Sequence, residues 1–163
     1  MKTFITLFIM LLSLTAYAHC CPGNCCPAES ESYKLAMLNK DFAKFIAAKE
    51  RQIEIEQAEI DNAADINNSF TGPSLVYSPE YHSKVNQKLE YATEDLKSRL
   101  IDLEVSFMDK NIFDLAHDCL KFLEAQSKLD IGSPHFAYPD QYREWQKKLN
   151  DALTRDIKNQ FTR

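Results

Sequence analysis

Residues 78–103 read SPEYHSKVNQKLEYATEDLKSRLIDL and predict one long amphipathic helix. Phe107 extends a series of apolar residues spaced three or four apart: Val85, Leu89, Ala92, Leu96, Leu100 and Leu103. This spacing places them on one face of an α-helix. Ser78 suits the N-cap, and Pro79 suits the first helical position, where its missing N–H costs nothing. So long an apolar face must pack against other helices, because a lone helix gains little stability from propensity.

The preceding segment predicts a second long helix over residues 28–68. No proline or glycine occurs in 28–70, so this helix can run for about 35 residues, or roughly 50 Å. Ser30 or Ser32 is a candidate cap. Its apolar residues also follow helical spacing: Leu35, Leu38, Phe42, Phe45, Ile46, Ile53, Ile60 and Ala63. Residues 67–79 are rich in turn formers and predict a connector with apolar anchors.

Two further helices are expected after Phe107. The sequence leaves open whether the central helix continues past Phe107 or breaks near residues 109–111, where Asp109 or Asn111 is a candidate cap. The predicted third helix has a broad apolar face: Ile112, Phe113, Leu115, Ala116, Cys119, Leu120, Phe122 and Leu123. Gly132 is predicted to end it, followed by Ser133 and Pro134. Pro139 begins a fourth helix, whose apolar face is Tyr142, Trp145, Leu149, Ala152 or Leu153, Ile157 and Phe161.

These segments predict an all-α protein, an antiparallel helical bundle of about four helices over residues 30–163. Only three glycines occur in the 163 residues, and strand-and-turn proteins use glycine repeatedly in tight turns. Short to moderate connectors favour sequential helices that pack as antiparallel neighbours. The alternative architecture is a two-helix coiled-coil hairpin with an added helical cap.

Residues 1–18, MKTFITLFIMLLSLTAYA, predict a cleaved secretory signal peptide. Lys2 is followed by an apolar run over residues 4–14, which is short for a membrane span. Ala16, Tyr17 and Ala18 form a small-x-small cleavage site. The mature chain should begin at His19 and work in an oxidising place, either periplasmic or secreted. No later segment of the sequence is apolar enough to predict a transmembrane helix.

Residues 19–29 form a cysteine-rich N-terminal tail that begins HCCPGNCCP. In an oxidising compartment its four cysteines favour two disulfides, one from each pair across the intervening turn, because a bond between adjacent cysteines would be strained. Reduced thiolates would instead select copper or zinc. The candidate metal ligands are His19, Cys20, Cys21, Cys25 and Cys26. Intermolecular cross-linking is the third alternative.

Other candidate residues have simpler interpretations. Cys119 is a small buried hydrophobe on the third helix, with a bridge to the N-terminal tail as the alternative. Asp114 and His117 have the carboxylate–histidine spacing of di-metal bundles, but the sequence holds no second such motif, so a polar helix face is favoured. His82 and His135 fall near predicted caps and loops, where histidines are commonly solvated. No Gly-x-Ser-x-Gly elbow or phosphate-binding glycine loop occurs.

The formal net charge of −5 argues against nucleic acid and anionic membrane surfaces as partners. We therefore expect an exported, non-catalytic helical binding or interaction protein, whose protein partner the sequence does not name. The alternative function is copper or zinc binding by the histidine and cysteines of the N-terminal tail. An enzyme is the most distant interpretation, because no catalytic constellation stands out.

Overall fold

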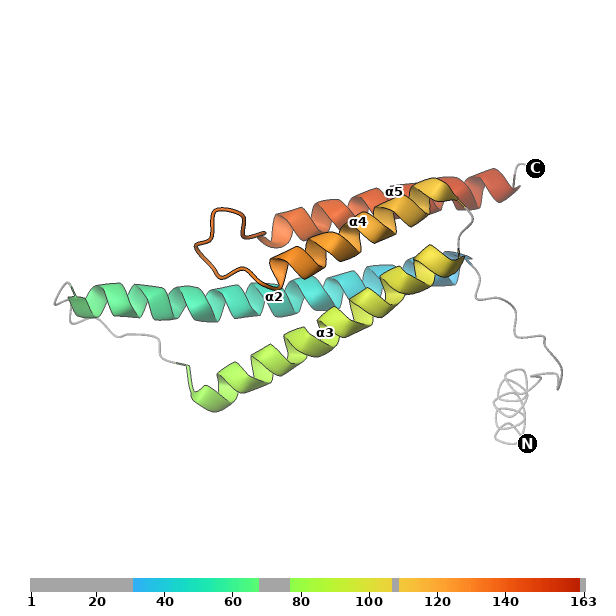
Figure 1. The fold of residues 1–163 in the computed structure, drawn as a ribbon. Helices are drawn as coiled ribbons and strands as arrows, with labels where there is room; N and C mark the ends of the chain where they lie inside the picture. Colours follow the sequence, from blue (N-terminus) through green and yellow to red (C-terminus); the bar gives the residue numbers. More distant parts are fainter. Residues whose placement is uncertain (1–30, 68–76, 107–108, 162–163) are drawn as a thin grey trace, which may run out of the picture. The chain divides into compact units, whose positions relative to one another are not determined.

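The computed structural model describes residues 31–67, 77–106 and 109–161, and these form an all-α fold without a strand (Figure 1). The helices are α2 (Glu31–Asn67), α3 (Pro79–Ser106), α4 (Lys110–Gln126) and α5 (Pro139–Phe161). They belong to one compact unit, Glu31–Arg163. The predicted fold class is confirmed. The predicted signal peptide and cysteine-rich tail lie outside the described residues.

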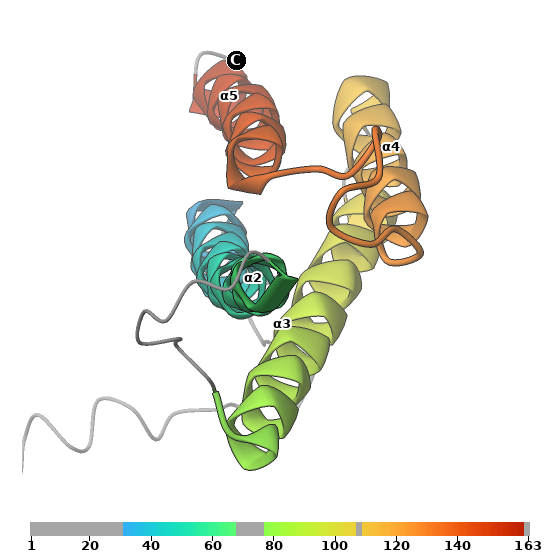
Figure 2. The same cartoon turned by 90° about the vertical axis from the view of Figure 1, so that its left-hand side faces the viewer.

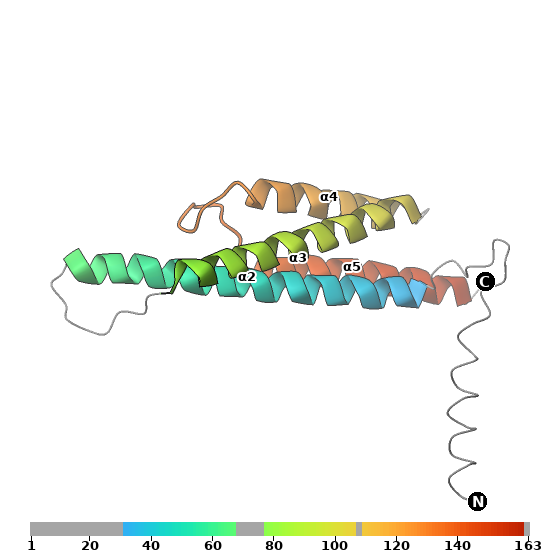
Figure 3. The ribbon, with the colours of Figure 1, turned by 90° about the horizontal axis from the view of Figure 1, so that it is seen from below.

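The helices pack as a ring in chain order. α2 contacts α3 and α5, and α4 contacts the same two helices. Figure 2 shows this arrangement nearly along the helix axes, with α2 and α4 at opposite corners. Each helix runs opposite to the one before it, as Figures 1 and 3 show. The architecture is therefore the antiparallel bundle that short connectors favour, rather than a hairpin with an added cap.

The helices differ greatly in length. α2 has 37 residues and α4 has 17, so α2 is longer by about 30 Å at 1.5 Å per residue. α2 extends past the ends of α4 and α5, first alongside the start of α3 and then past the start of α3 as well (Figure 3). Ile60, which follows the helical spacing of the apolar residues of α2, is 48% exposed for this reason, and Ala63 is also exposed. Helical spacing alone therefore does not place Ile60 and Ala63 in the core.

The core lies where all four helices meet. The predicted face of α3 is buried as expected from Val85 to Leu103, with Leu96 and Leu100 fully inaccessible and Leu89 partly buried, while Phe107 lies outside the described residues. Side chains of α2 and α5 pack on this face, and the rings of Phe45 and Tyr142 meet edge to face with centroids 4.9 Å apart. Burial of aliphatic and aromatic surface of this kind is the main stabilising contribution to such a bundle.

The starts of α3 and α4 follow the predicted capping residues. Tyr81 donates its backbone N–H to Ser78 Oγ over 3.2 Å, and Pro79 is the first helical residue. Asp109 is the N-cap of α4, because its Oδ1 accepts the backbone N–H of Asn111 over 2.8 Å. α3 and α4 are therefore separate helices, which settles the question that the sequence left open. Ser30, a candidate cap of α2, lies outside the described residues.

α4 ends at Gln126, six residues before the predicted end at Gly132. The residues that follow form a loop, 127–138, to which the Gln126 side chain is hydrogen-bonded. Its Nε2 donates to the carbonyl of His135 over 3.0 Å, and its Oε1 accepts the N–H of Ala137 over 2.6 Å. Gly132 has a φ of 95°, a left-handed conformation that glycine adopts without steric cost, and it serves a turn inside the loop.

Candidate binding groove between α2 and α3

A groove of about 650 Å³ lies between α2 and α3. Its floor is made of small apolar side chains, with Val85 and Ala92 each only 6% exposed. Ala47 and Ala48 complete the floor from α2. The walls carry tyrosines and charged residues, and we call the whole feature the basic groove: besides the floor it is lined by Lys44, Arg51, Tyr81, Lys84, Lys88, Tyr91 and Asp95.

Helical spacing brings the cations together. Lys84 and Lys88 are four residues apart on α3, and Lys44 and Arg51 are seven apart on α2, so each pair shares one helix face. The antiparallel packing turns these two faces toward the same groove. Four cations and the single carboxylate of Asp95 give the lining a net charge of +3 (four minus one). The groove thus has the opposite sign to the chain, whose net charge is −5.

Two of the four cations are already paired. Lys44 Nζ lies 3.0 Å from Asp95 Oδ2, and this hydrogen bond raises the pKa of Lys44. Arg51 pairs with Glu54 and donates from Nε to the Tyr81 hydroxyl over 2.6 Å. The hydrogen bond to Glu54 is the main reason why the pKa of Arg51 is raised.

The other two cations, Lys84 and Lys88, are exposed and form no ion pair with the residues that the structure describes. Their ammonium groups stand on the α3 side of the groove, one helical turn apart. They are therefore available to meet negative charge on a ligand.

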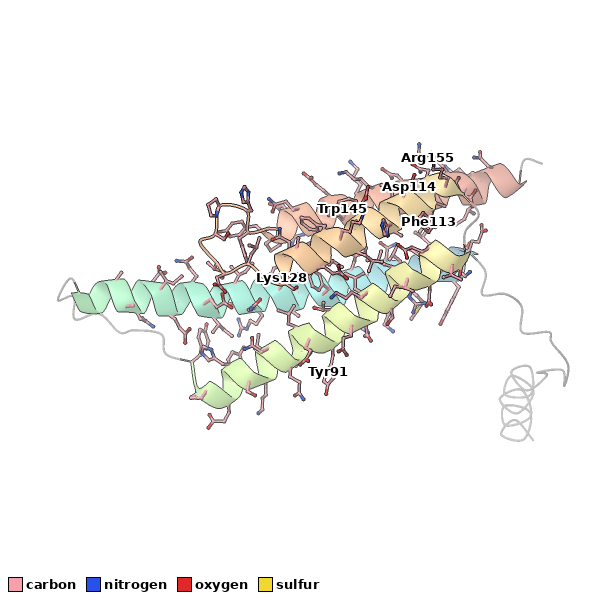
Figure 4. All side chains as sticks on the ribbon, viewed as in Figure 1. Tyr91, Phe113, Asp114, Lys128, Trp145 and Arg155 are labelled. Carbon is pink, nitrogen blue, oxygen red and sulfur yellow. The ribbon has the colours of Figure 1, made fainter. Side chains whose placement is uncertain are left out.

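Tyrosine rings give the groove an amphipathic wall. Tyr81 stacks on Tyr77 with ring centroids 5.4 Å apart, and the Arg51 guanidinium lies 5.5 Å from the Tyr81 centroid. Tyr91, labelled on α3 in Figure 4, is 58% exposed and accepts a hydrogen bond from Gln87 over 3.3 Å. Such rings combine a large apolar surface with a polar tip, which is why tyrosine is enriched at binding interfaces.

The predicted metal ligands of the N-terminal tail lie outside the described residues. Within those residues no group of three or more His, Cys, Asp or Glu side chains is placed to hold a metal. Asp114 is exposed on α4 (Figure 4), while His117 Nδ1 lies 3.0 Å from Glu104 Oε1 on α3. The His117 ring also stacks on Phe113, with centroids 5.9 Å apart. His117 therefore makes a contact between α4 and α3, whereas the Asp114 carboxylate is exposed to solvent.

The remaining candidates are structural. Cys119 is fully buried in the core, and burial raises the pKa of its thiol to about 12. A buried thiol with so high a pKa is unreactive, which agrees with its interpretation as a small hydrophobe. His82 Nε2 lies 3.4 Å from Glu59 Oε1 and links α3 to α2. His135 is exposed in the loop of residues 127–138.

The basic groove was not predicted from the sequence, although part of its signal is there. Tyr81, Lys84, Lys88 and Tyr91 follow one another at steps of three, four and three, which marks a second face of α3 beside the apolar one. The residues of α2 that meet this face depend on the register between the two helices. Periodicity along one helix carries no information about that register.

Comparison of the chain with protein-family models, with curated proteins and with solved structures found no match in any of the three. None of the described helices combines the length and apolar character needed to cross a bilayer. The chemistry of the groove is therefore the guide to function. Its lining of cations, tyrosines and small apolar residues is suited to bind an anionic, amphipathic ligand.

Proposed function

We propose that this protein is an exported, non-catalytic binding protein whose basic groove holds an acidic amphipathic helix of a partner protein. The observation that carries this proposal is a small apolar floor beside two lysines on one rim that form no ion pair with the described residues. An amphipathic helix in a groove buries its apolar face on the floor. Its flanking acidic side chains then meet the cations, and this complementarity selects the partner and its orientation.

The dimensions of the groove suit a helix. Its α3 side runs from Tyr81 to Asp95, and fourteen residue steps span about 21 Å, or roughly four helical turns. Alanines on the floor allow a third helix to approach closely, because the distance between helix axes depends on the side chains at the contact. Lys84 and Lys88, four residues apart, match acidic residues at the same spacing on the partner.

The test uses a fluorescent peptide with leucines on one helix face and glutamates beside them, together with a twin in which lysine replaces each glutamate. We expect the acidic peptide to bind the mature protein and the basic twin to bind far more weakly, as read by fluorescence anisotropy. The double substitution Lys84→Glu and Lys88→Glu should reduce affinity at least about tenfold, equivalent to about 1.4 kcal/mol. Added salt should weaken binding, because exposed charges are screened within about 8 Å at physiological ionic strength.

The matched control is the double substitution Lys121→Glu and Lys147→Glu, on exposed positions of α4 and α5 that do not line the groove. It changes the net charge equally and should leave the affinity unchanged. Equal loss in both double variants would mean that only net charge matters, and the groove would then not be the site.

The alternative function, copper or zinc binding, is supported by the sequence of the N-terminal tail alone. It predicts metal uptake by His19, Cys20, Cys21, Cys25 and Cys26 that the groove substitutions leave unchanged. Metal titration of the same variants separates the two functions. Tight metal binding without any peptide binding would favour this alternative.

A further inference from the structure

A second cleft, of about 460 Å³, borders different faces of α2 and α3 and shares no lining residue with the basic groove. The end of α4, the start of α5 and the loop of residues 127–138 complete its walls. Phe45 and Tyr142 are buried apolar residues of these walls. Phe136, in the loop, is 6% exposed. Gln126 is hydrogen-bonded to the backbone of both neighbours of Phe136, His135 and Ala137, and these bonds fix the position of Phe136.

Lys49, on α2, lines this cleft and is only 8% exposed. We call the feature the lysine cleft. Lys49 Nζ donates to Gln52 Oε1 over 2.8 Å and lies 4.8 Å from the centroid of the Phe136 ring. No carboxylate of the described residues lies within ion-pair distance of its Nζ, and Glu56, which also lines the cleft, attracts it only from farther away. Lysines are almost never so buried unless they are paired, because a desolvated charge without a counter-charge is costly. A ligand carboxylate in direct contact with Lys49 would offset this cost.

The residues that line the lysine cleft carry a net negative charge, opposite in sign to Lys49. Two cations, Lys49 and Lys97, face four carboxylates, so the net charge of the lining is −2 (two minus four). The four carboxylates are Glu56, Glu90, Glu94 and Asp130. Glu90 and Glu94 are exposed and four residues apart on α3, so they stand together at the opening. The cleft thus presents a buried cation, apolar walls and an acidic rim.

We propose that the lysine cleft binds a small zwitterion, whose carboxylate pairs with Lys49 and whose ammonium group lies between Glu90 and Glu94. An apolar linker between the two charges would contact the aromatic walls. The volume falls within the range of pockets that hold small ligands. The proposal is independent of the helix-binding function, because the two sites have no residue in common.

The test uses ε-aminocaproate, which carries both charges on an unbranched linker, and two analogues that each lack one charge, caproate and hexylamine. Calorimetric titration of the mature protein should show binding of ε-aminocaproate. Each analogue should bind at least about tenfold more weakly, because it loses one ion pair in a partly desolvated site. If caproate binds as tightly as ε-aminocaproate, the acidic rim takes no part and the proposal is wrong.

Variants assign the two ends of the ligand. With Lys49→Met, ε-aminocaproate should no longer bind more tightly than hexylamine. With the double substitution Glu90→Gln and Glu94→Gln, it should no longer bind more tightly than caproate. Lys121→Met is the control on an exposed lysine outside the cleft, and it should change neither ratio. Far-UV circular dichroism checks that each variant is folded, and the two exposed glutamates provide a test that does not alter the core. Unchanged ratios in both sets of variants would overturn the proposal.

Discussion

The basic groove and the lysine cleft border the same two helices, yet they hold their charges in different ways. Lys84 and Lys88 stand exposed at the groove, where water solvates them and salt screens them. Lys49 is 8% exposed in its cleft, and burial lowers the pKa of its amine. Exposed charges guide a large partner at little cost to stability, whereas a buried charge destabilises the fold and discriminates strongly between ligands.

The two sites also differ in the elements that build them. The groove needs only α2 and α3, but the cleft also needs α4, α5 and the loop of residues 127–138. A substitution that disrupts the loop should therefore weaken binding in the cleft and leave binding in the groove unchanged. The following predictions test this difference, beginning with the largest expected effect.

Gln126→Leu should destabilise the fold by about 3 kcal/mol. The substitution leaves the buried N–H of Ala137, a residue 2% exposed, and the partly buried carbonyl of His135 without their partner. A buried unsatisfied group costs about 1–3 kcal/mol, and the partly buried carbonyl adds a smaller cost. Urea unfolding followed by circular dichroism measures the loss. Zwitterion binding in the cleft should weaken, because Phe136 is no longer held, while peptide binding in the groove is retained. Equal loss at both sites would show that they are not separable.

Arg99→Met should destabilise the fold by about 2 kcal/mol. Arg99 Nε lies 3.2 Å from Asp41 Oδ2, and Asp41 is 3% exposed. The substitution leaves this buried carboxylate with Lys44 alone, whose Nζ is 3.6 Å away. Removing one partner of a buried pair costs about 3–5 kcal/mol, and the remaining lysine reduces this cost.

The double variant Asp41→Asn with Arg99→Met is the control for that prediction, since it also removes the stranded charge. Thermal melts should show a smaller loss for the double variant than for Arg99→Met alone. If the double variant loses more, the carboxylate is not the source of the penalty.

Lys49→Met should stabilise the fold by about 1 kcal/mol near neutral pH, because it removes a desolvated ammonium group. A lowered pKa means that the folded state binds this proton less tightly than the unfolded state does. The penalty is therefore complete below the folded pKa, and it disappears as the pH rises from that value toward 10.5. The stability advantage of Lys49→Met should shrink over this window, as measured by urea unfolding at several pH values. A constant advantage would point to packing instead. The other charged residues that line the cleft are Glu56 on α2, Glu90, Glu94 and Lys97 on α3, and Asp130 in the loop. Of these, Glu56 raises the pKa of Lys49, but less than burial lowers it.

Periodicity predicted the helices well, because the spacing of buried residues is a local property of the chain. The face of α3, the caps Ser78 and Asp109 and the start of α5 at Pro139 all follow from neighbouring residues. The end of α4 did not, because Gln126 bonds to a loop eleven residues away. The exposure of Ile60 likewise depends on how far α4 and α5 reach. Both candidate sites depend on the register between helices, which single-helix patterns do not contain.

Because Cys119 is buried, its thiol can serve as a probe of how often the bundle opens. It is fully inaccessible in the centre of α4, so a thiol reagent reaches it only after the helices separate. In a chain whose four N-terminal cysteines are replaced by serine, it would be the one thiol of the molecule. Its modification rate at low reagent concentration would then report the equilibrium between closed and open molecules. At high concentration the rate would approach that of opening itself.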